Sequence, residues 1–175
     1  KYIVVLTGAG ISQESGIKTF RDQNGLWENH SIQEVASFEA YLKNPKLVHQ
    51  FYNLRRAQLK EVVPNRAHLA LAQLEKKSGF KLAIITQNVD DLHERAGSTN
   101  VIHMHGELRK IKNLKSGEIK YFEDSIEEPL YKIWRPDIVW FGESIKAFDE
   151  INECLNSADI FLCIGTSNQV YPAAG

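Results

Sequence analysis

The sequence lacks the features by which several common classes of protein are assigned. Its two cysteines, Cys154 and Cys163, form no Cys-x-x-Cys pair and cannot by themselves supply four zinc ligands. No apolar run is long enough to span a bilayer. Basic residues are not in excess, with 21 Lys and Arg against 22 Asp and Glu. We therefore expect neither membrane insertion nor nucleic-acid binding, and we interpret the cysteines as small buried residues in a reducing cytoplasm.

The 175 residues suffice for one sizeable core but not for two full domains, so residues 1–175 are expected to form a single domain. Short runs rich in Ile and Val alternate with stretches of helical periodicity, which favours an α/β fold with a doubly wound parallel sheet. The expected strands are Tyr2–Thr7, Leu82–Thr86, Val101–His105, Ile138–Phe141 and Asp159–Gly165. The expected helices are Asn44–Glu61, Arg66–Lys77 and Ser144–Ser157.

Two long stretches interrupt this alternation of strands and helices. Residues 17–63 separate the first two strands by far more than a simple crossover requires. Residues 108–136 are polar, highly charged and poor in clear periodicity. We interpret both stretches as insertions that build additional structure beside the sheet.

Glycines follow the first expected strand and the last one. The turn Gly8-Ala9-Gly10-Ile11-Ser12 lies where backbone N–H groups and a helix N-terminus could approach a pyrophosphate. The third glycine of the common dinucleotide fingerprint is missing, because Gln13 occupies its position. A tight turn without a ligand is therefore an alternative. A second small turn, Gly165-Thr166-Ser167, would lie at the same carboxyl edge of the sheet and favours a dinucleotide site.

Amide, carboxylate and imidazole side chains end the two intervening strands. The segment Gln87-Asn88-Val89-Asp90 follows one of them, and His105 closes the next. Because the carboxyl ends of parallel strands meet at one edge, we expect Asn88, Asp90 and His105 to converge on one ligand. A histidine at a strand end is more often structural than catalytic. Beside an amide and a carboxylate, however, we interpret His105 as a general base.

In their order along the chain, these motifs resemble those of the sirtuins. The resemblance covers nearly the whole sequence and rests on Gly8-Ala9-Gly10-Ile11-Ser12, Ser15-Gly16-Ile17, Phe20-Arg21-Asp22, Thr86-Gln87-Asn88-Val89-Asp90, His105-Gly106-Glu107, Pro136-Asp137-Ile138-Val139-Trp140-Phe141-Gly142-Glu143 and Gly165-Thr166-Ser167. It implies a Rossmann-like fold with a small inserted lobe. It also implies an enzyme that removes acyl groups from protein lysines and consumes NAD as a co-substrate.

The resemblance further implies a reaction course and roles for the cofactor residues. The acyl-lysine oxygen attacks C1′ of the nicotinamide ribose, nicotinamide leaves, and His105 accepts a proton from the ribose hydroxyls. The products are free lysine and O-acyl-ADP-ribose. The two glycine turns would line the pyrophosphate, and Gln87 and Asn88 would contact the ribose. Asp90, with the backbone of Val89, would bind the carboxamide.

Two further segments take their roles from the same resemblance. Arg21 would help to hold the phosphates, Phe20 would cover the reacting carbon, and Asp22 would fix the loop that carries both. The segment Val139-Trp140-Phe141-Gly142-Glu143 would offer an extended backbone to which a substrate peptide adds as a strand. For its two aromatic rings, a place in the core is the alternative.

The preferred acyl group is predicted from one helix face. Tyr52 and Arg55 are three residues apart and share this face, so a phenol and a guanidinium could clamp a carboxylate. An arginine that extends to solvent along the helix is the alternative. Sirtuins of class III carry this pair together with an alanine that corresponds to Ala36. The resemblance therefore implies removal of succinyl, malonyl or glutaryl groups, with some activity on acetyl.

The sequence departs from the sirtuin pattern in two places. Most sirtuins hold a structural zinc in the stretch that corresponds to residues 108–135, which has no cysteine here. We therefore expect no zinc and a small apolar core instead, formed by Tyr121, Phe122, Leu130, Tyr131, Ile133 and Trp134. In the family, further strands and helices follow the segment near Val170, so we expect the C-terminal part of the fold to be missing from this sequence.

Three other functions are open at this point. The chain could be an NAD or ADP-ribose binding module without chemistry, or a mono-ADP-ribosyltransferase on the same scaffold. A hydride-transferring dehydrogenase is the weakest alternative, because it would need the third glycine. For the favoured function, we expect acylated lysines of proteins as partners, a monomer, and a cytoplasmic location.

Overall fold

Four parallel strands form the main sheet of the computed structural model, which describes residues 1–18, 26–27 and 30–175. They are β1 (Tyr2–Thr7), β4 (Lys81–Thr86), β5 (Val101–His103) and β9 (Ile160–Ile164). Their order in the sheet is β5-β4-β1-β9. The chain thus adds strands on one side of β1 and then crosses to the other side. This confirms the doubly wound α/β sheet, and its switch point lies between β1 and β9.

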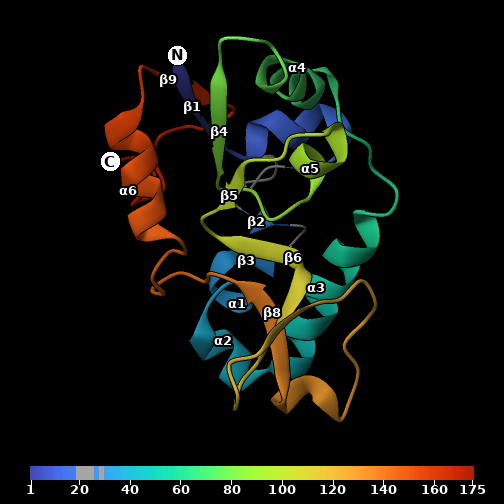
Figure 1. Ribbon diagram of the computed structural model, residues 1–175. Helices are drawn as coiled ribbons and strands as arrows, with labels where there is room; N and C mark the ends of the chain where they lie inside the picture. The colour runs from blue at the N-terminus through green and yellow to red at the C-terminus, as the bar shows by residue number, and fades with distance from the viewer. Residues whose placement is uncertain (19–25, 28–29) are drawn as a thin grey trace.

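Helices cover both faces of this sheet (Figure 1). One face carries the 3₁₀ helix η1 (Ala9–Ser15), α4 (Arg66–Glu75) and α5 (Leu92–Ala96), and the other carries α6 (Phe148–Ser157). Side chains of β1 alternate between the two: Val5 packs with Leu71 of α4, and Val4 packs in the cluster of Ile151 of α6. Burial on both faces explains why β1 and β4 are continuous apolar runs, whereas β9 at the edge of the sheet is apolar but largely exposed.

A second part of the molecule lies beyond one end of the sheet (Figure 1). It contains β2 (Leu26–Trp27), β3 (His30–Ser31), α1 (Ile32–Val35), α2 (Phe38–Lys43) and α3 (Pro45–Gln58). Asn44 starts α3 by accepting a hydrogen bond from the Leu47 N–H at 3.1 Å, and Pro45 suits the first turn. The helices pack with Trp140 and Tyr52 in a separate core.

A three-stranded antiparallel sheet in the order β7-β6-β8 completes this part. Its elements are β6 (Gly106–Asn113), β7 (Ile119–Tyr121), the 3₁₀ helix η2 (Leu130–Lys132) and β8 (Trp134–Ile138). In the described residues, no helix is both long and apolar enough to cross a membrane.

The predicted strand Ile138–Phe141 is wrong in position and partner. The strand there is β8, which ends at Ile138 and pairs with β6 in the antiparallel sheet rather than in the parallel one. From Val139 onward, backbone groups bond to other segments, because Val139 N–H reaches the His105 carbonyl and Phe141 N–H reaches the Ala36 carbonyl. Ile138 and Trp140 of this run are buried in the core of the helices while Phe141 is exposed, so the apolar pattern alone does not distinguish a strand from other backbone.

The expected core of the 108–136 stretch is correct in part. Tyr131 is buried, and Phe122 and Trp134 pack against it, but the two residues that join it in the core are Ile111 and Ile126. The exposed positions among those expected are Tyr121, Leu130 and Ile133. The cysteines also differ from expectation, since Cys163 is exposed on β9 and Cys154 is partly buried.

Candidate NAD and acyl-lysine site

The two glycine turns lie against each other at the switch point of the sheet. The Gly8 N–H donates to the Ile164 carbonyl at 3.1 Å, and the Gly10 N–H donates to the Gly165 carbonyl at 2.8 Å. A Cβ on Gly10 would lie 2.9 Å from that carbonyl oxygen, too close for an ordinary contact. Gly165 itself has φ of 65°, a conformation that favours glycine. The glycines are thus required by the contact of the turns, which leaves a backbone cradle suited to a pyrophosphate.

Ser12 joins this cradle to the polar segment after β4. Its hydroxyl donates to Asp90 Oδ2 at 2.9 Å and accepts a hydrogen bond from Asn88 Nδ2 at 3.1 Å. All three side chains are buried. Burial raises the pKa of Asp90, and hydrogen bonds from the Leu92 N–H and from Ser12 oppose this shift. The predicted residues Ser12, Asn88 and Asp90 therefore form one connected unit.

Two buried histidines contact this unit and the end of β1. His68 Nε2 lies 3.4 Å from the Ser12 hydroxyl, and His93 Nε2 lies 3.0 Å from Thr7 Oγ1. Thr7 in turn donates to Thr86 Oγ1 at 2.8 Å. Burial lowers the pKa of each histidine to about 4. Both rings are therefore neutral near pH 7 and can act as hydrogen-bond donors without adding charge.

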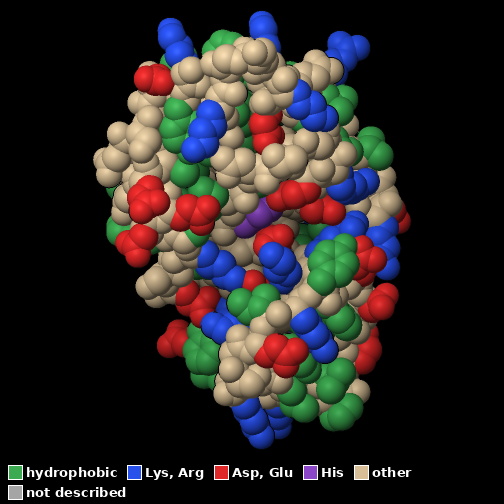
Figure 2. Space-filling model, in the orientation of Figure 1, with side chains coloured by type: hydrophobic (Ala, Val, Ile, Leu, Met, Phe, Trp, Pro, Cys, Tyr) green, Lys and Arg blue, Asp and Glu red, His purple; other side chains and the backbone are tan. Residues whose placement is uncertain are grey.

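His105 has the geometry of a neutral base. Its Nδ1 lies 3.0 Å from the Gln87 carbonyl oxygen, and because a carbonyl can only accept, Nδ1 carries the proton. Burial lowers the pKa of His105, although this hydrogen bond opposes the shift. Near pH 7, Nε2 therefore presents a lone pair. Histidine reaches the surface in the middle of the face shown in Figure 2, next to acidic side chains.

The remaining predicted cofactor residues lie around the same edge. Gln87 Nε2 donates to Thr166 Oγ1 at 3.0 Å and so links the turn after β9 to the segment after β4. The Val89 carbonyl accepts from the Leu108 N–H at 2.9 Å. Ser167 is exposed. The predicted residues Phe20, Arg21 and Asp22 lie outside the described residues.

A pocket lies between α3 and the Asp90 segment. Its described lining comprises Ile17, Lys18, Arg55, Gln58, Leu59, Val89, Asp90 and Leu108. Arg55 thus faces the cavity that the predicted nicotinamide-binding residue also lines, and its guanidinium lies 5.5 Å from the centre of the Phe51 ring. Arg55 and Asp90 therefore line the same pocket.

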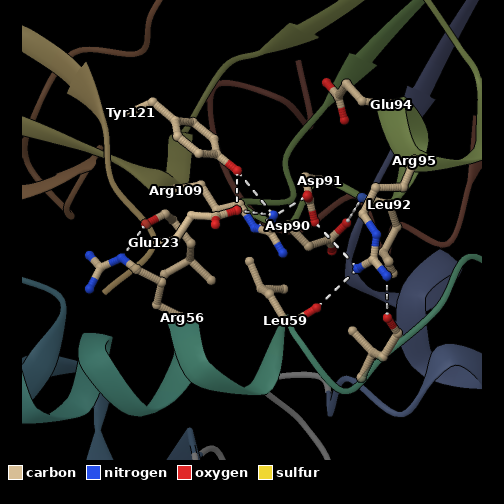
Figure 3. A network of polar contacts seen from close by, with 12 residues as sticks. Arg56, Leu59, Asp90, Asp91, Leu92, Glu94, Arg95, Arg109, Tyr121 and Glu123 are labelled. Atoms are coloured by element: carbon tan, nitrogen blue, oxygen red, sulfur yellow. Dashed lines mark hydrogen bonds and ion pairs between the residues drawn. The ribbon is translucent and has the colours of Figure 1, made fainter. Parts of the chain in front are cut away.

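Ion pairs fix the wall of this pocket (Figure 3). Asp91 lies 3.3 Å from Nε of Arg109 and 3.7 Å from Arg95. Arg95 also donates to the Leu59 carbonyl at 3.0 Å, at the end of α3, and Arg109 pairs with Glu123 at 2.6 Å. The segment that carries Asp90 is therefore tied both to α3 and to the antiparallel sheet.

Tyr52 is not among the described residues that line the pocket, so the predicted pair of Tyr52 and Arg55 does not meet in it. Tyr52 is fully buried, and its hydroxyl oxygen accepts a hydrogen bond from Trp140 Nε1 at 2.9 Å. Trp140 is held in turn by Arg135, whose guanidinium lies 3.6 Å from the centre of the indole ring. Arg135 also pairs with both carboxylate oxygens of Glu143, at 2.6 and 2.9 Å. Trp140 is thus held by Tyr52 and Arg135, and Glu143 by Arg135.

The segment from Val139 to Glu143 has most of its N–H groups occupied within the chain. Those of Val139 and Phe141 donate to carbonyls of His105 and Ala36, and those of Trp140 and Glu143 donate within the segment. Ala36 is buried beside this segment. A peptide that adds here as a strand would therefore bond chiefly to carbonyl oxygens.

Sequence reasoning did not identify several residues of the site. Arg135 directly precedes one of the motifs, and His103 is two residues before His105. No sequence pattern of their own marks either residue as part of the site. Strand alternation was no signal for His103, because β5 ends at His103, two residues before the predicted end, and His105 lies in the following turn. The contacts of Arg95 and Arg109 join segments far apart in sequence, and no local pattern shows them.

Comparison with known proteins decides the family. Residues 8–172 match the Sir2 family. The chain belongs to the Sir2 family. A relative from Pasteurella multocida, named NAD-dependent protein deacylase, is 57% identical over 182 residues, which cover 99% of this chain and 78% of the relative. A relative from Salmonella typhimurium with the same name is 51% identical over 186 residues, covering 99% of this chain and 67% of the relative.

Solved structures agree with this family. A mutant Sir2 homologue in complex with ADP-ribose is 41% identical, with a TM-score of 0.91 over 99% of this chain and 73% of that one. A Sir2 homologue in complex with NAD is 42% identical, with a TM-score of 0.89 over 99% of this chain and 71% of that one. A Sir2 complex with a p53 peptide and NAD⁺ is 32% identical, with a TM-score of 0.83, covering 99% and 74%.

Among the residues for which positions are described, no three His, Cys, Asp or Glu side chains come together as metal ligands would. The groups that the site offers are backbone N–H groups, hydroxyls, an amide, a carboxylate and a neutral imidazole, which suit a dinucleotide.

Proposed function

We propose that this chain catalyses NAD-dependent removal of acyl groups from protein lysines and that it prefers acyl groups that end in a carboxylate. The observation that carries the activity is the connection of the glycine cradle to Asn88, Asp90 and the neutral base His105. Membership of the Sir2 family supports it, as do the names of the relatives. NAD enters as a substrate and supplies the electrophilic ribose carbon.

The residues divide the chemical work among them. The turns at Gly8 and Gly165 form the cradle for the pyrophosphate; the N–H groups of Gly8 and Gly10 hold the two turns together, and other N–H groups of the turns face the phosphates. Asn88 and Asp90, fixed by Ser12, orient the ribose and the carboxamide. His105 Nε2 takes a proton from a ribose hydroxyl, which can then attack the acyl-derived carbon. In balance, acyl-lysine, NAD and water give lysine, nicotinamide and O-acyl-ADP-ribose.

The preference for succinyl, malonyl or glutaryl groups rests on Arg55. Its position in the pocket beside Asp90 brings a cation within reach of an acyl chain that enters from the lysine side. Tyr52, buried on the same helix and bonded to Trp140, and Ala36 in the same core complete the set of residues on which this proposal rests. A charged contact of this kind is worth roughly 2–5 kcal/mol when one partner is removed.

The test uses peptides of one sequence that differ only in their acyl group. We expect the chain to remove succinyl faster than acetyl in the presence of NAD. Replacement of Arg55 by Met should reduce succinyl removal by roughly 30-fold or more and leave acetyl removal nearly unchanged. Gln58→Met serves as the matched control on the same helix end. Equal rates on both peptides in the unaltered chain would refute the acyl preference but not the deacylase activity.

A further inference from the structure

Two alternate histidines contact consecutive peptide groups of the candidate site. His103 ends β5, and His105 lies two residues further on, in the turn that leads to β6. His105 Nδ1 lies 3.0 Å from the carbonyl oxygen of Gln87, and His103 Nδ1 lies 3.1 Å from that of Asn88. Both rings therefore donate to the backbone of the segment that presents Asn88 and Asp90.

The second nitrogen of His103 has a different partner. His103 Nε2 lies 2.7 Å from Oε1 of Glu94 on α5. A carbonyl oxygen and a carboxylate oxygen both accept only, whereas a neutral imidazole has one N–H. Both contacts can exist together only when the ring of His103 is the doubly protonated imidazolium. The side chain of His103 is 7% exposed and that of Glu94 is 40% exposed, so the cation is buried and its partner reaches solvent.

The surrounding charges favour this state. Burial lowers the pKa of His103, but the hydrogen bond and charge of Glu94, with the charge of Glu107 on β6, outweigh burial and raise it. On α5, His93 is neutral because burial lowers its pKa to about 4. Across the segment, the positive charge of His103 lowers the pKa of Asp90 and so opposes the larger effect of burial. His103 and His105 are thus driven to opposite protonation states, one a charged support and one a neutral base.

We propose that His103 is a positioning residue whose imidazolium, paired with Glu94, fixes the Asn88 carbonyl and thereby the orientation of the Gln87–Asp90 segment for the reaction. This role rests on the proposed function, because it acts through Asn88 and Asp90. The protonation of His103 in the free chain does not depend on that function.

The two histidines then set opposite limits of the pH profile. The rate of deacylation rises with pH as His105 loses its proton. This rise falls below pH 6.5, the ordinary pKa of histidine, because burial lowers the pKa of His105. The rate falls above 6.5 when His103, whose pKa is raised, loses the second proton and with it one of its two hydrogen bonds. Removing the charge of Glu94 should move the alkaline limit to lower pH and leave the acidic limit unchanged.

The first test measures ring nitrogen chemical shifts of the histidines by NMR in the free chain, with His103 assigned through a His103→Gln variant. At pH 7 we expect both ring nitrogens of His103 to be protonated and His105 to be neutral, with its proton on Nδ1. In the Glu94→Gln variant, His103 should become neutral at a lower pH than in the unaltered chain. A neutral His103 at pH 7 in the unaltered chain would overturn the proposal.

The second test compares kcat across pH for Glu94→Gln and for Glu107→Gln, which removes a nearby charge without breaking the contact. We expect a severalfold loss of kcat on the alkaline side for Glu94→Gln and a smaller one for Glu107→Gln. An alkaline limit that stays in place for Glu94→Gln would overturn the positioning role. An imidazolium His103 in a chain without deacylase activity would refute the proposed function, whereas an active chain with neutral His103 would refute this proposal alone.

Discussion

Removal of the Tyr52 hydroxyl should destabilise the chain and alter its acyl preference together. Tyr52 is fully buried, and its oxygen is the acceptor for Trp140 Nε1 at 2.9 Å. In Tyr52→Phe, the indole N–H stays buried and loses this acceptor, which costs about 1–3 kcal/mol. For a chain of this size the expected loss of Tm is roughly 2–12 °C. Removal of succinyl should slow more than removal of acetyl.

A double-mutant cycle isolates the contact. Trp140→Phe removes the donor, and the variant with both changes leaves neither polar atom, so its cost should fall short of the sum by about 1 kcal/mol or more. Urea denaturation of the four chains measures this coupling. Tyr131→Phe is the matched control, because the Tyr131 hydroxyl lies 3.4 Å from Glu127 and should contribute little. Additive costs for Tyr52 and Trp140 would refute the reasoning.

Three further predictions concern pH, the glycine cradle and metal. The free energy of unfolding should fall as pH drops from 6.5 to 4. His49 of α3, His68 and His93 have pKa values lowered to about 4 by burial, so the unfolded chain takes up protons at higher pH than the folded chain. Urea midpoints across this range measure the loss, and a constant midpoint would contradict it. Gly10→Ala should weaken NAD binding by roughly 5- to 150-fold, the equivalent of 1–3 kcal/mol of overpacking, because its Cβ would press on the Gly165 carbonyl oxygen at 2.9 Å; calorimetric titration with NAD checks this, and unchanged affinity would mean that the turns need not touch. Chelation with EDTA should leave Tm unchanged, because Ile111, Ile126 and Tyr131 form an apolar core where zinc was not expected; a fall in Tm that added zinc restores would show that a metal contributes.

The sequence was sufficient to predict the parallel sheet and the cluster at its edge. The central strands β1 and β4 are apolar runs because helices cover both of their faces, and this pattern is local. The positions of Asn88, Asp90 and His105 follow from where those runs end. The convergence of the two glycine turns follows from the strand order, since β1 and β9 are neighbours.

The parts that could not be predicted depend on contacts between distant segments. The run after Ile138 looks like a strand, yet its partners are single carbonyls of His105 and Ala36. Ile111 and Ile126 are isolated among charged residues, and only the folded antiparallel sheet brings them to Tyr131. The partner of His103 is nine residues away on a helix, and its charge state follows from that contact rather than from its place in the sequence.

The proposed NAD-dependent deacylation can be tested by the stoichiometry of one reaction. The chain is incubated with NAD and a succinyl-lysine peptide, and nicotinamide, free-lysine peptide and O-succinyl-ADP-ribose are quantified by mass spectrometry. We expect equal amounts of the three products from the unaltered chain and no product from the His105→Ala variant. Nicotinamide release with ADP-ribose bound to protein would contradict it and indicate a transferase. NAD binding without any nicotinamide release would contradict it as well and leave a binding module.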